Sequence, residues 1–203
     1  MATAVKAPEA LALLEFSSIA RGSRVLDDVV KKAPVDVHTA TPVSHGKYLL
    51  IFTGDVGSVD ESFRAGVAAG GELITNKLYL PQVHVEVALS LESRLAIEDV
   101  DALAIVETTS MATTVGAADA AAKCANVHLI EIRLGQGIGG KGYFTMTGAQ
   151  SDVEAAVEAA REVASRDAAL VTAEIIARPS SELIANLAGE AWRPHSLPKA
   201  RKA

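Results

Sequence analysis

The second half of the chain shows two hydrophobic periodicities in a fixed order. Four of its segments are apolar and β-prone, which predicts strands at residues 103–108, 127–134, 143–147 and 170–178. The alanine-rich segment 113–124, with threonines at its start, predicts a helix after the first strand. Residues 151–165 predict a second helix, because their apolar side chains form one stripe: Val153, Val157, Ala160 and Val163. Ser151 and Glu154 have the spacing of a capping box at the start of this helix.

The first half of the chain repeats this order of segments. "LALLEFSS" from Leu11 resembles "LAIVETTS" from Leu103, and "GKYLLIFTG" from Gly46 resembles "GKGYFTMTG" from Gly140. The offset grows from 92 to 94 residues between these two matches, so the second copy has the longer loop there. Pro34 ends the first helix of this copy. Asp55 or Ser58 begins its second helix, whose inward positions are predicted to be Val56, Val59, Phe63 and Val67.

Each copy therefore has the element order β-α-β-β-α-β. This order predicts an α/β fold, in which two helices pack on one face of a four-stranded antiparallel sheet. We expect two such domains in tandem, at residues 1–97 and 98–187, followed by a basic C-terminal tail at residues 188–203.

Composition narrows the possible functions by exclusion. The 203 residues are 49% hydrophobic with a net charge of −6, which is globular but argues against a nucleic-acid partner. The single cysteine, Cys124, excludes an internal disulfide, and we expect it to be a small buried hydrophobic residue. His38, His84 and His128 lie in strand patterns without metal-ligand spacing, so no metal is expected. No apolar stretch approaches the roughly 20 residues that span a bilayer, so no membrane partner is expected either.

The glycine-rich segment "GQGIGGKGYF" at residues 135–144 fits most of two phosphate-binding patterns, G-x-x-x-x-G-K-[ST] and G-x-G-x-x-G. Both patterns need a helix after the glycines, whereas "YFTMTG" predicts a strand. Gly142 also stands where the first pattern needs Ser or Thr. We therefore interpret the segment as a β–β loop, equivalent to "PVSHGKY" in the first copy. Two equivalent loops in one chain suggest a ring in which three chains place six loops around one centre.

The second copy resembles the bacterial microcompartment shell domain. The resemblance rests on the strand ending in Glu-Thr, the "AADAAAKCANV" helix, the glycine loop, the Thr-Gly before an acidic helix start, and the closing "RP". The first copy is more divergent but keeps "TGDVGSV", so the resemblance covers about residues 10–187. It implies a tandem-domain, unpermuted shell protein of which three chains build one hexagonal tile with a central pore.

This resemblance also implies a structural role rather than an enzymatic one, with no catalytic residue, in the shell of a cytoplasmic microcompartment. The implied partners are the chain itself, as a homotrimer, and hexameric and pentameric shell proteins. One subgroup of the family carries an iron–sulfur cluster at the pore through a loop cysteine. This chain has no cysteine at the corresponding position, so no cofactor is expected.

The resemblance assigns roles to individual residues. The pore-lining positions are Ser44, His45, Gly46, Gly135, Gln136, Gly137, Ile138, Gly139 and Gly140. His45 adds a pH-sensitive charge there. Tile-edge roles fall on Lys31, Lys123 and Arg178; Leu80 replaces the arginine in the first copy, so three of six edges would carry it. Without the resemblance, both lysines are interpreted as solvated helix ends that suit the helix dipole.

Two alternative functions stay open at this point. One is a regulatory trimer that binds a small molecule, which needs a concave pocket with convergent polar groups. The other is an enzyme that uses the glycine loop for phosphate chemistry, which needs a base and a nucleophile or metal nearby. Only His45 qualifies near the loop. Glu15 and Glu107 are expected to be structural, bonding to backbone or to a neighbouring side chain.

Overall fold

The computed structural model describes residues 8–92 and 100–188, and it contains the predicted fold twice. The first repeat consists of β1 (Ala10–Phe16), α1 (Ile19–Lys32), β2 (Asp36–Val43), the short turn η1 (Ser44–Gly46), β3 (Lys47–Gly54), α2 (Val56–Gly70), η2 (Gly71–Leu73), β4 (Ile74–Leu80) and α3 (Val85–Glu92). The second consists of β5 (Ala102–Thr108), α4 (Met111–Cys124), β6 (Val127–Leu134), β7 (Gly142–Gly148), α5 (Gln150–Arg166), β8 (Leu170–Ala177) and α6 (Ser181–Ala188). The strand order is β2-β3-β1-β4 in one antiparallel sheet and β6-β7-β5-β8 in the other, so the α/β fold prediction is confirmed.

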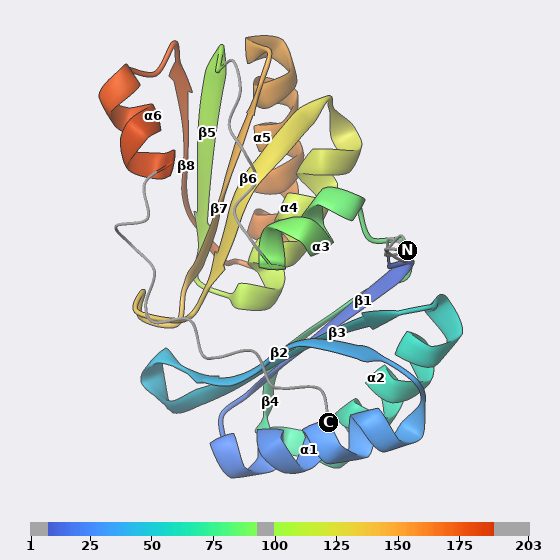
Figure 1. Ribbon diagram of the computed structural model, residues 1–203. Coiled ribbons are helices and arrows are strands. Elements are labelled where there is room, and N and C mark those ends of the chain that lie inside the picture. The colour runs from blue at the N-terminus through green and yellow to red at the C-terminus, as the bar shows by residue number, and fades with distance from the viewer. Residues whose placement is uncertain (1–7, 93–99, 189–203) are drawn as a thin grey trace.

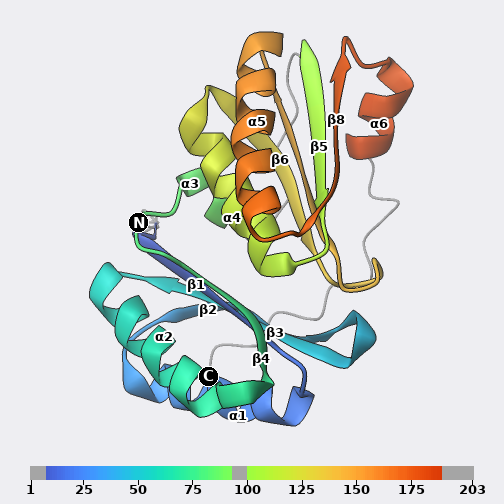
Figure 2. The ribbon, with the colours of Figure 1, turned by 180° about the vertical axis from the view of Figure 1, so that it is seen from behind.

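The two repeats pack against each other through helix α4. Helices α1 and α2 cover one face of the first sheet, and α4 lies on its other face, between the two sheets (Figure 1, Figure 2). Buried side chains of the first sheet, such as Leu11, Leu13 and Ile51, share one core with α4 and the second sheet. Helix α4 is consequently buried on nearly all sides, whereas α1 buries only Gly22, Val25 and Val29.

Helix starts follow the expected chemistry but not always the expected residue. Asp55 caps α2 by accepting a hydrogen bond from the Ser58 amide at 3.0 Å, as predicted. Ser110, and not a threonine, caps α4. The capping box predicted for α5 is wrong: Ser151 lies inside the helix, and the Asp101 carboxylate accepts from the Gln150 amide at 3.1 Å. An acidic side chain from the residue before β5, 49 positions earlier in the chain, thus takes the place of a local cap.

The predicted apolar stripes are largely confirmed. Val153, Val157 and Ala160 of α5 are buried, and Val59 of α2 is fully buried. Val56 is the exception, since it is 39% exposed at the first position of α2.

Helices α3 and α6 were not predicted, and α3 has a clear structural role. It covers the edge strand β6, where the Glu86 carboxylate accepts the Leu129 amide at 2.8 Å and contacts the His128 ring at 2.9 Å. Covering an edge strand satisfies backbone groups that would otherwise pair with another chain. His84 lies in the turn before α3 and not in a strand, which corrects the sequence interpretation.

Three further sequence predictions concern the ends of elements. Cys124 is exposed at the last position of α4, so the prediction of a buried thiol is wrong. The predicted boundary at residue 97 and the tail from residue 189 onward lie outside the described residues. Within the described part of the chain, no helix has the length and apolarity to span a membrane.

Candidate functional site

The two loops predicted to line a pore are built from residues in the left-handed backbone region. In the first loop, His45 has φ 62° and Gly46 has φ 72°. In the second, Gly135, Gly137, Gly139 and Gly140 all have φ between 66° and 74°. This region is costly for residues with a Cβ atom, which explains the glycines and singles out His45. The second loop leads into β7, so the nucleotide-binding interpretation fails on the structural context as well.

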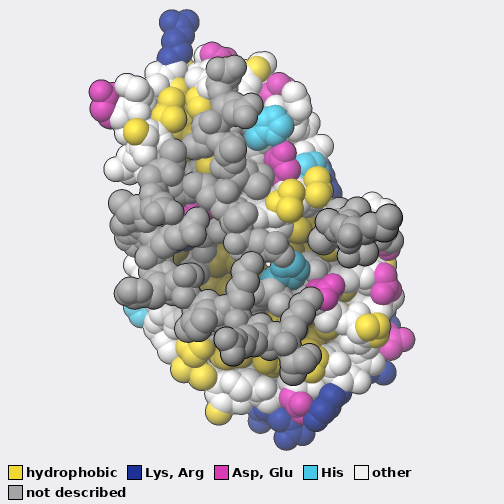
Figure 3. All heavy atoms as spheres, viewed as in Figure 1, with side chains coloured by type: hydrophobic (Ala, Val, Ile, Leu, Met, Phe, Trp, Pro, Cys, Tyr) yellow, Lys and Arg dark blue, Asp and Glu magenta, His cyan; other side chains and the backbone are white. Residues whose placement is uncertain are grey.

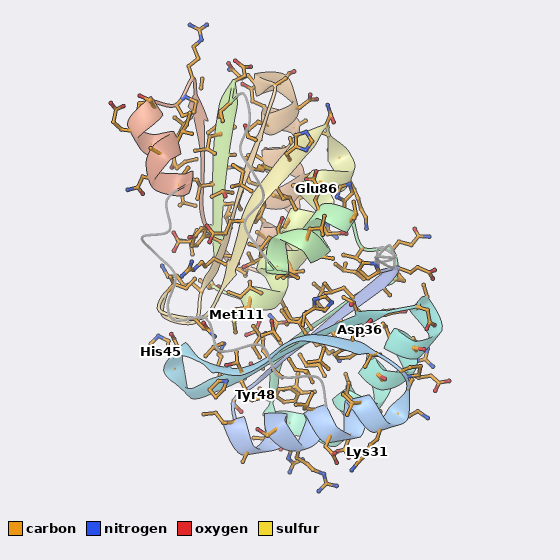
Figure 4. All side chains as sticks on the ribbon, viewed as in Figure 1. Lys31, Asp36, His45, Tyr48, Glu86 and Met111 are labelled. Carbon is orange, nitrogen blue, oxygen red and sulfur yellow. The ribbon has the colours of Figure 1, made fainter. Side chains whose placement is uncertain are left out.

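These two loops lie against each other, although they are more than 90 residues apart in sequence. The Gly137 amide donates a hydrogen bond to the Ser44 hydroxyl at 3.2 Å. A Cβ atom on Gly139 would stand 3.4 Å from the His45 ring, and one on Gly140 would stand 3.4 Å from the Ser44 carbonyl. The β2–β3 and β6–β7 loops are seen side by side in both ribbon views, with His45 at the tip of the first (Figure 1, Figure 2, Figure 4).

Exposure divides the second loop into two parts. Gly135 is buried against Met111 and Val43. A Cβ atom added at Gly135 would stand 2.6 Å from the Met111 sulfur and 2.9 Å from Val43. Gly140 is also buried. The exposed positions of the two loops are His45, Gly46, Gln136, Gly137 and Gly139, and Ser44 and Ile138 are half-buried. The groups that these loops present to solvent are therefore uncharged side chains, backbone amides and one imidazole.

A buried carboxylate holds the junction between the repeats next to these loops. Glu15 of β1 has 1% of its side chain exposed. Its carboxylate accepts the Ala112 amide at 2.9 Å and the Ser110 hydroxyl at 3.3 Å, both at the N-terminus of α4. Lys47, the residue after the first loop, lies 3.3 Å from the same carboxylate. Negative charge at a helix N-terminus is favourable, so Glu15 joins the sheet of the first repeat to the helix of the second. The predicted structural role of Glu15 is confirmed.

The second repeat contains the same acid–lysine pair, but in the described part of the chain no helix N-terminus is hydrogen-bonded to its carboxylate. Lys141, the residue after the second loop, lies 2.7 Å from the Glu107 carboxylate. The Glu107 side chain is 33% exposed, compared with 1% for Glu15. Glu107 occupies on β5 the place that Glu15 occupies on β1. Glu15 is aligned with Leu49 of β3 and Glu107 with Tyr143 of β7, and these two partner residues match at the 94-residue offset of the repeats.

The predicted edge residues are distributed unevenly. Lys31 is 71% exposed and, among the described residues, pairs with Asp27, one turn earlier in α1. It belongs to a group of basic side chains that gather over α1 at the lower end of the molecule (Figure 3, Figure 4). Lys123 instead bridges the Asp119 carboxylate and the Gln82 carbonyl of the first repeat. Arg178 is exposed in a left-handed conformation, φ 48°, immediately after β8.

Among the described residues, no group of three or more His, Cys, Asp or Glu side chains is arranged to hold a metal ion. Sequence reasoning placed the equivalent loops around one centre but missed the direct hydrogen bond between the two loops of one chain. It also missed the function of Glu15 as a junction residue. The one signal available in the sequence was that Glu15 and Glu107 repeat at the same offset as the strands that carry them.

Comparisons with known proteins agree with this geometry. The BMC domain model matches the chain twice, at residues 10–83 and 102–179. The chain is 35% identical over 175 residues to the bacterial microcompartment shell protein PduT of Citrobacter freundii, covering 86% of this chain and 95% of that protein. It is 30% identical over 191 residues to the carboxysome assembly protein CcmO of Synechococcus elongatus, covering 85% and 68%.

Solved structures give the same result. A microcompartment protein from Desulfitobacterium hafniense shares 39% identity with a TM-score of 0.81, covering 88% of this chain and 99% of that one. A fused permuted hexameric shell protein, at 21% identity and a TM-score of 0.58, supports the fold alone.

The chain belongs to the bacterial microcompartment shell family. With two such domains in tandem, it is a shell protein of the tandem-domain kind, a structural component of a cytoplasmic microcompartment rather than an enzyme. Proteins of this family assemble with other shell proteins into multimeric shells.

Proposed function

We propose that three copies of this chain close into a hexagonal tile whose central opening passes small metabolites. The observation that carries the proposal is the contact between the two loops. One loop from each repeat ends at the same place, beside the junction that α4 makes with the first sheet. If each domain meets the next as the two repeats meet here, three chains bring six such loops together at the centre.

The opening would be lined by neutral and weakly polar groups. The exposed backbone at Gly139 favours anionic solutes. Lys47 and Lys141, which follow the two loops, add no uncompensated charge because each is paired with a glutamate. Selectivity then depends on the width of the opening and on this lining.

We also propose that the tile joins hexameric and pentameric shell proteins through edges that carry Lys31, Lys123 and Arg178. Lys31 offers the clearer test, because Lys123 also holds the junction inside the chain. Replacing an exposed lysine that has only one surface ion pair costs at most about 1 kcal/mol of folding stability. Lys31→Glu is therefore expected to lower the thermal midpoint by no more than about 2–4 °C while reducing incorporation into mixed shells.

The transport role is tested with closed shells that contain the tile. Gln136→Glu places three carboxylates at the proposed opening, and it is expected to slow efflux of a trapped anionic dye several-fold relative to a neutral sugar. The matched control is Ser151→Glu, which adds the same charge beyond the far end of β7 from the loop. Equal anion efflux from both variants and the wild type would contradict a pore at these loops.

A further inference from the structure

Helix α1 leaves exposed the surface that its counterpart α4 buries. Five positions of α4 are between 0% and 7% exposed at the junction of the repeats: Met111, Ala112, Val115, Asp119 and Ala122. At the offset of 92 residues, the corresponding positions of α1 are Ile19, Ala20, Ser23, Asp27 and Val30, and all five are exposed. Two of them, Ile19 at 42% and Val30 at 44%, are large apolar side chains that have no covering element within the described residues.

The second sheet carries a carboxylate equivalent to the one that binds the N-terminus of α4. Glu15 is buried because the N-terminus of α4 rests on it, and the Ser110 hydroxyl and Ala112 amide bond to its carboxylate. Glu107 is its counterpart, with its own lysine in place, yet it remains one-third exposed. Ser18 caps α1 as Ser110 caps α4, since each hydroxyl accepts the amide three residues later.

We infer that Glu107 binds the N-terminus of α1 of a second copy of this chain. The Glu107 carboxylate accepts the Ser18 hydroxyl and the Ala20 amide of the neighbouring copy, and Lys141 completes the pairing. This contact repeats between chains the arrangement that Glu15 makes within one chain. It is head-to-tail, so it closes into a ring when three copies join. The inference rests on the proposed trimer and assigns the residues that hold it together.

The contact is expected to be strong, because it combines a helix N-terminus with charge-assisted hydrogen bonds. Ser18→Asp tests it directly. Aspartate is as good an N-cap as serine, so α1 stays folded in the isolated chain. In the assembly, however, the introduced carboxylate faces that of Glu107. Because hydrogen bonds to charged groups are worth more than neutral ones, we expect each junction to weaken roughly 10- to 100-fold.

Two variants complete the design. Glu107→Gln alone removes the negative charge at residue 107 and is expected to weaken each junction about tenfold. In the Ser18→Asp background, Glu107→Gln removes the repulsion between the two carboxylates and is expected to restore most of the lost affinity. Ser110→Asp is the matched control, because it places the same repulsion against Glu15 inside one chain. It is expected to lower the thermal midpoint of the chain rather than to change its assembly alone.

Assembly is measured by light scattering or sedimentation across a dilution series, with circular dichroism to confirm helix content. Weaker trimers for Ser18→Asp, restored by Glu107→Gln, support the inference. A wild-type trimer that Ser18→Asp leaves unchanged overturns the inference but not the proposed tile. A wild-type chain that is monomeric at all concentrations overturns both. If Ser18→Asp loses helix content, Glu107→Gln alone decides, and an undiminished trimer then overturns the inference.

Discussion

A glycine in α1 makes room for an aromatic ring, and replacing it tests how the first repeat is packed. A Cβ atom on Gly22 would lie 2.3 Å from Cδ1 of Tyr48 and 2.8 Å from its Cβ. The Tyr48 side chain is buried at 4% exposure between α1 and β3 (Figure 4), and the contact is with the root of the ring, so it has no room to move aside. In the second repeat the larger residue is on the helix and the glycine is on the strand, because Thr114 replaces Gly22 and Gly142 replaces Tyr48. A Cβ atom added at Gly142 would lie 2.1 Å from the Thr114 hydroxyl.

Two opposing effects decide the outcome of Gly22→Ala. Alanine stabilises a helix interior by about 1 kcal/mol relative to glycine. Overpacking a tight core costs about 1–3 kcal/mol, and a contact this short falls at the upper end of that range. We expect a net loss of about 1–2 kcal/mol, which for a chain of this size lowers the thermal midpoint by roughly 2–8 °C.

The assay is a double-mutant cycle with Tyr48→Gly, which removes the ring and also the Cβ atom that alanine would keep, followed by thermal or urea unfolding. In the Tyr48→Gly background the clash is gone, so Gly22→Ala is expected to change sign and stabilise by about 1 kcal/mol. Gly116→Ala in α4 is the matched control: its Cβ atom would meet Leu78 at an ordinary 3.5 Å, and it should stabilise the wild type. A loss of stability for Gly22→Ala in both backgrounds would refute the packing argument.

Two further predictions concern α2 and α4. Hydrogen bonds from the Ser58 side chain and amide lower the pKa of Asp55 below its ordinary 3.8. The ionised Asp55 carboxylate therefore stabilises the folded chain above pH 3.8, and this contribution is lost as the pH falls through the lowered pKa of the folded state. Asp55→Asn is therefore expected to show a smaller fall in thermal midpoint between about pH 6 and pH 3 than the wild type, and equal falls would contradict this. Cys124 is exposed, so one thiol per native chain is expected to react with Ellman's reagent, whereas reaction only after unfolding would contradict its position.

Much of the fold is predictable because local sequence patterns encode its elements and the same order of elements occurs in both repeats. The strands β5, β6, β7 and β8 fall within a residue of their predicted limits, since each is a short apolar run bounded by a helix signal or glycines. The two missed helices have a different origin. Helix α3 is only eight residues long, and its Glu86 is fixed by the edge of β6, a contact that the sequence does not reveal.

The site was predictable in part for the same reason. The glycine loop and its partner in the first repeat were found from their equivalent positions between strands. Their mutual contact, and the burial of Glu15 under α4, depend on how the repeats pack, which no local pattern encodes. Cys124 shows the converse error: a residue in an alanine-rich helix looks buried, yet it lies at the helix end where the core stops.

The most direct test of the account is an electron cryomicroscopy structure of the purified chain. Particles are expected to have three times the 21.1 kDa mass of one chain, with residues 44–46 and 136–139 of every copy around a central opening. A single unassociated chain, or a ring with these loops at its outer rim, would contradict it.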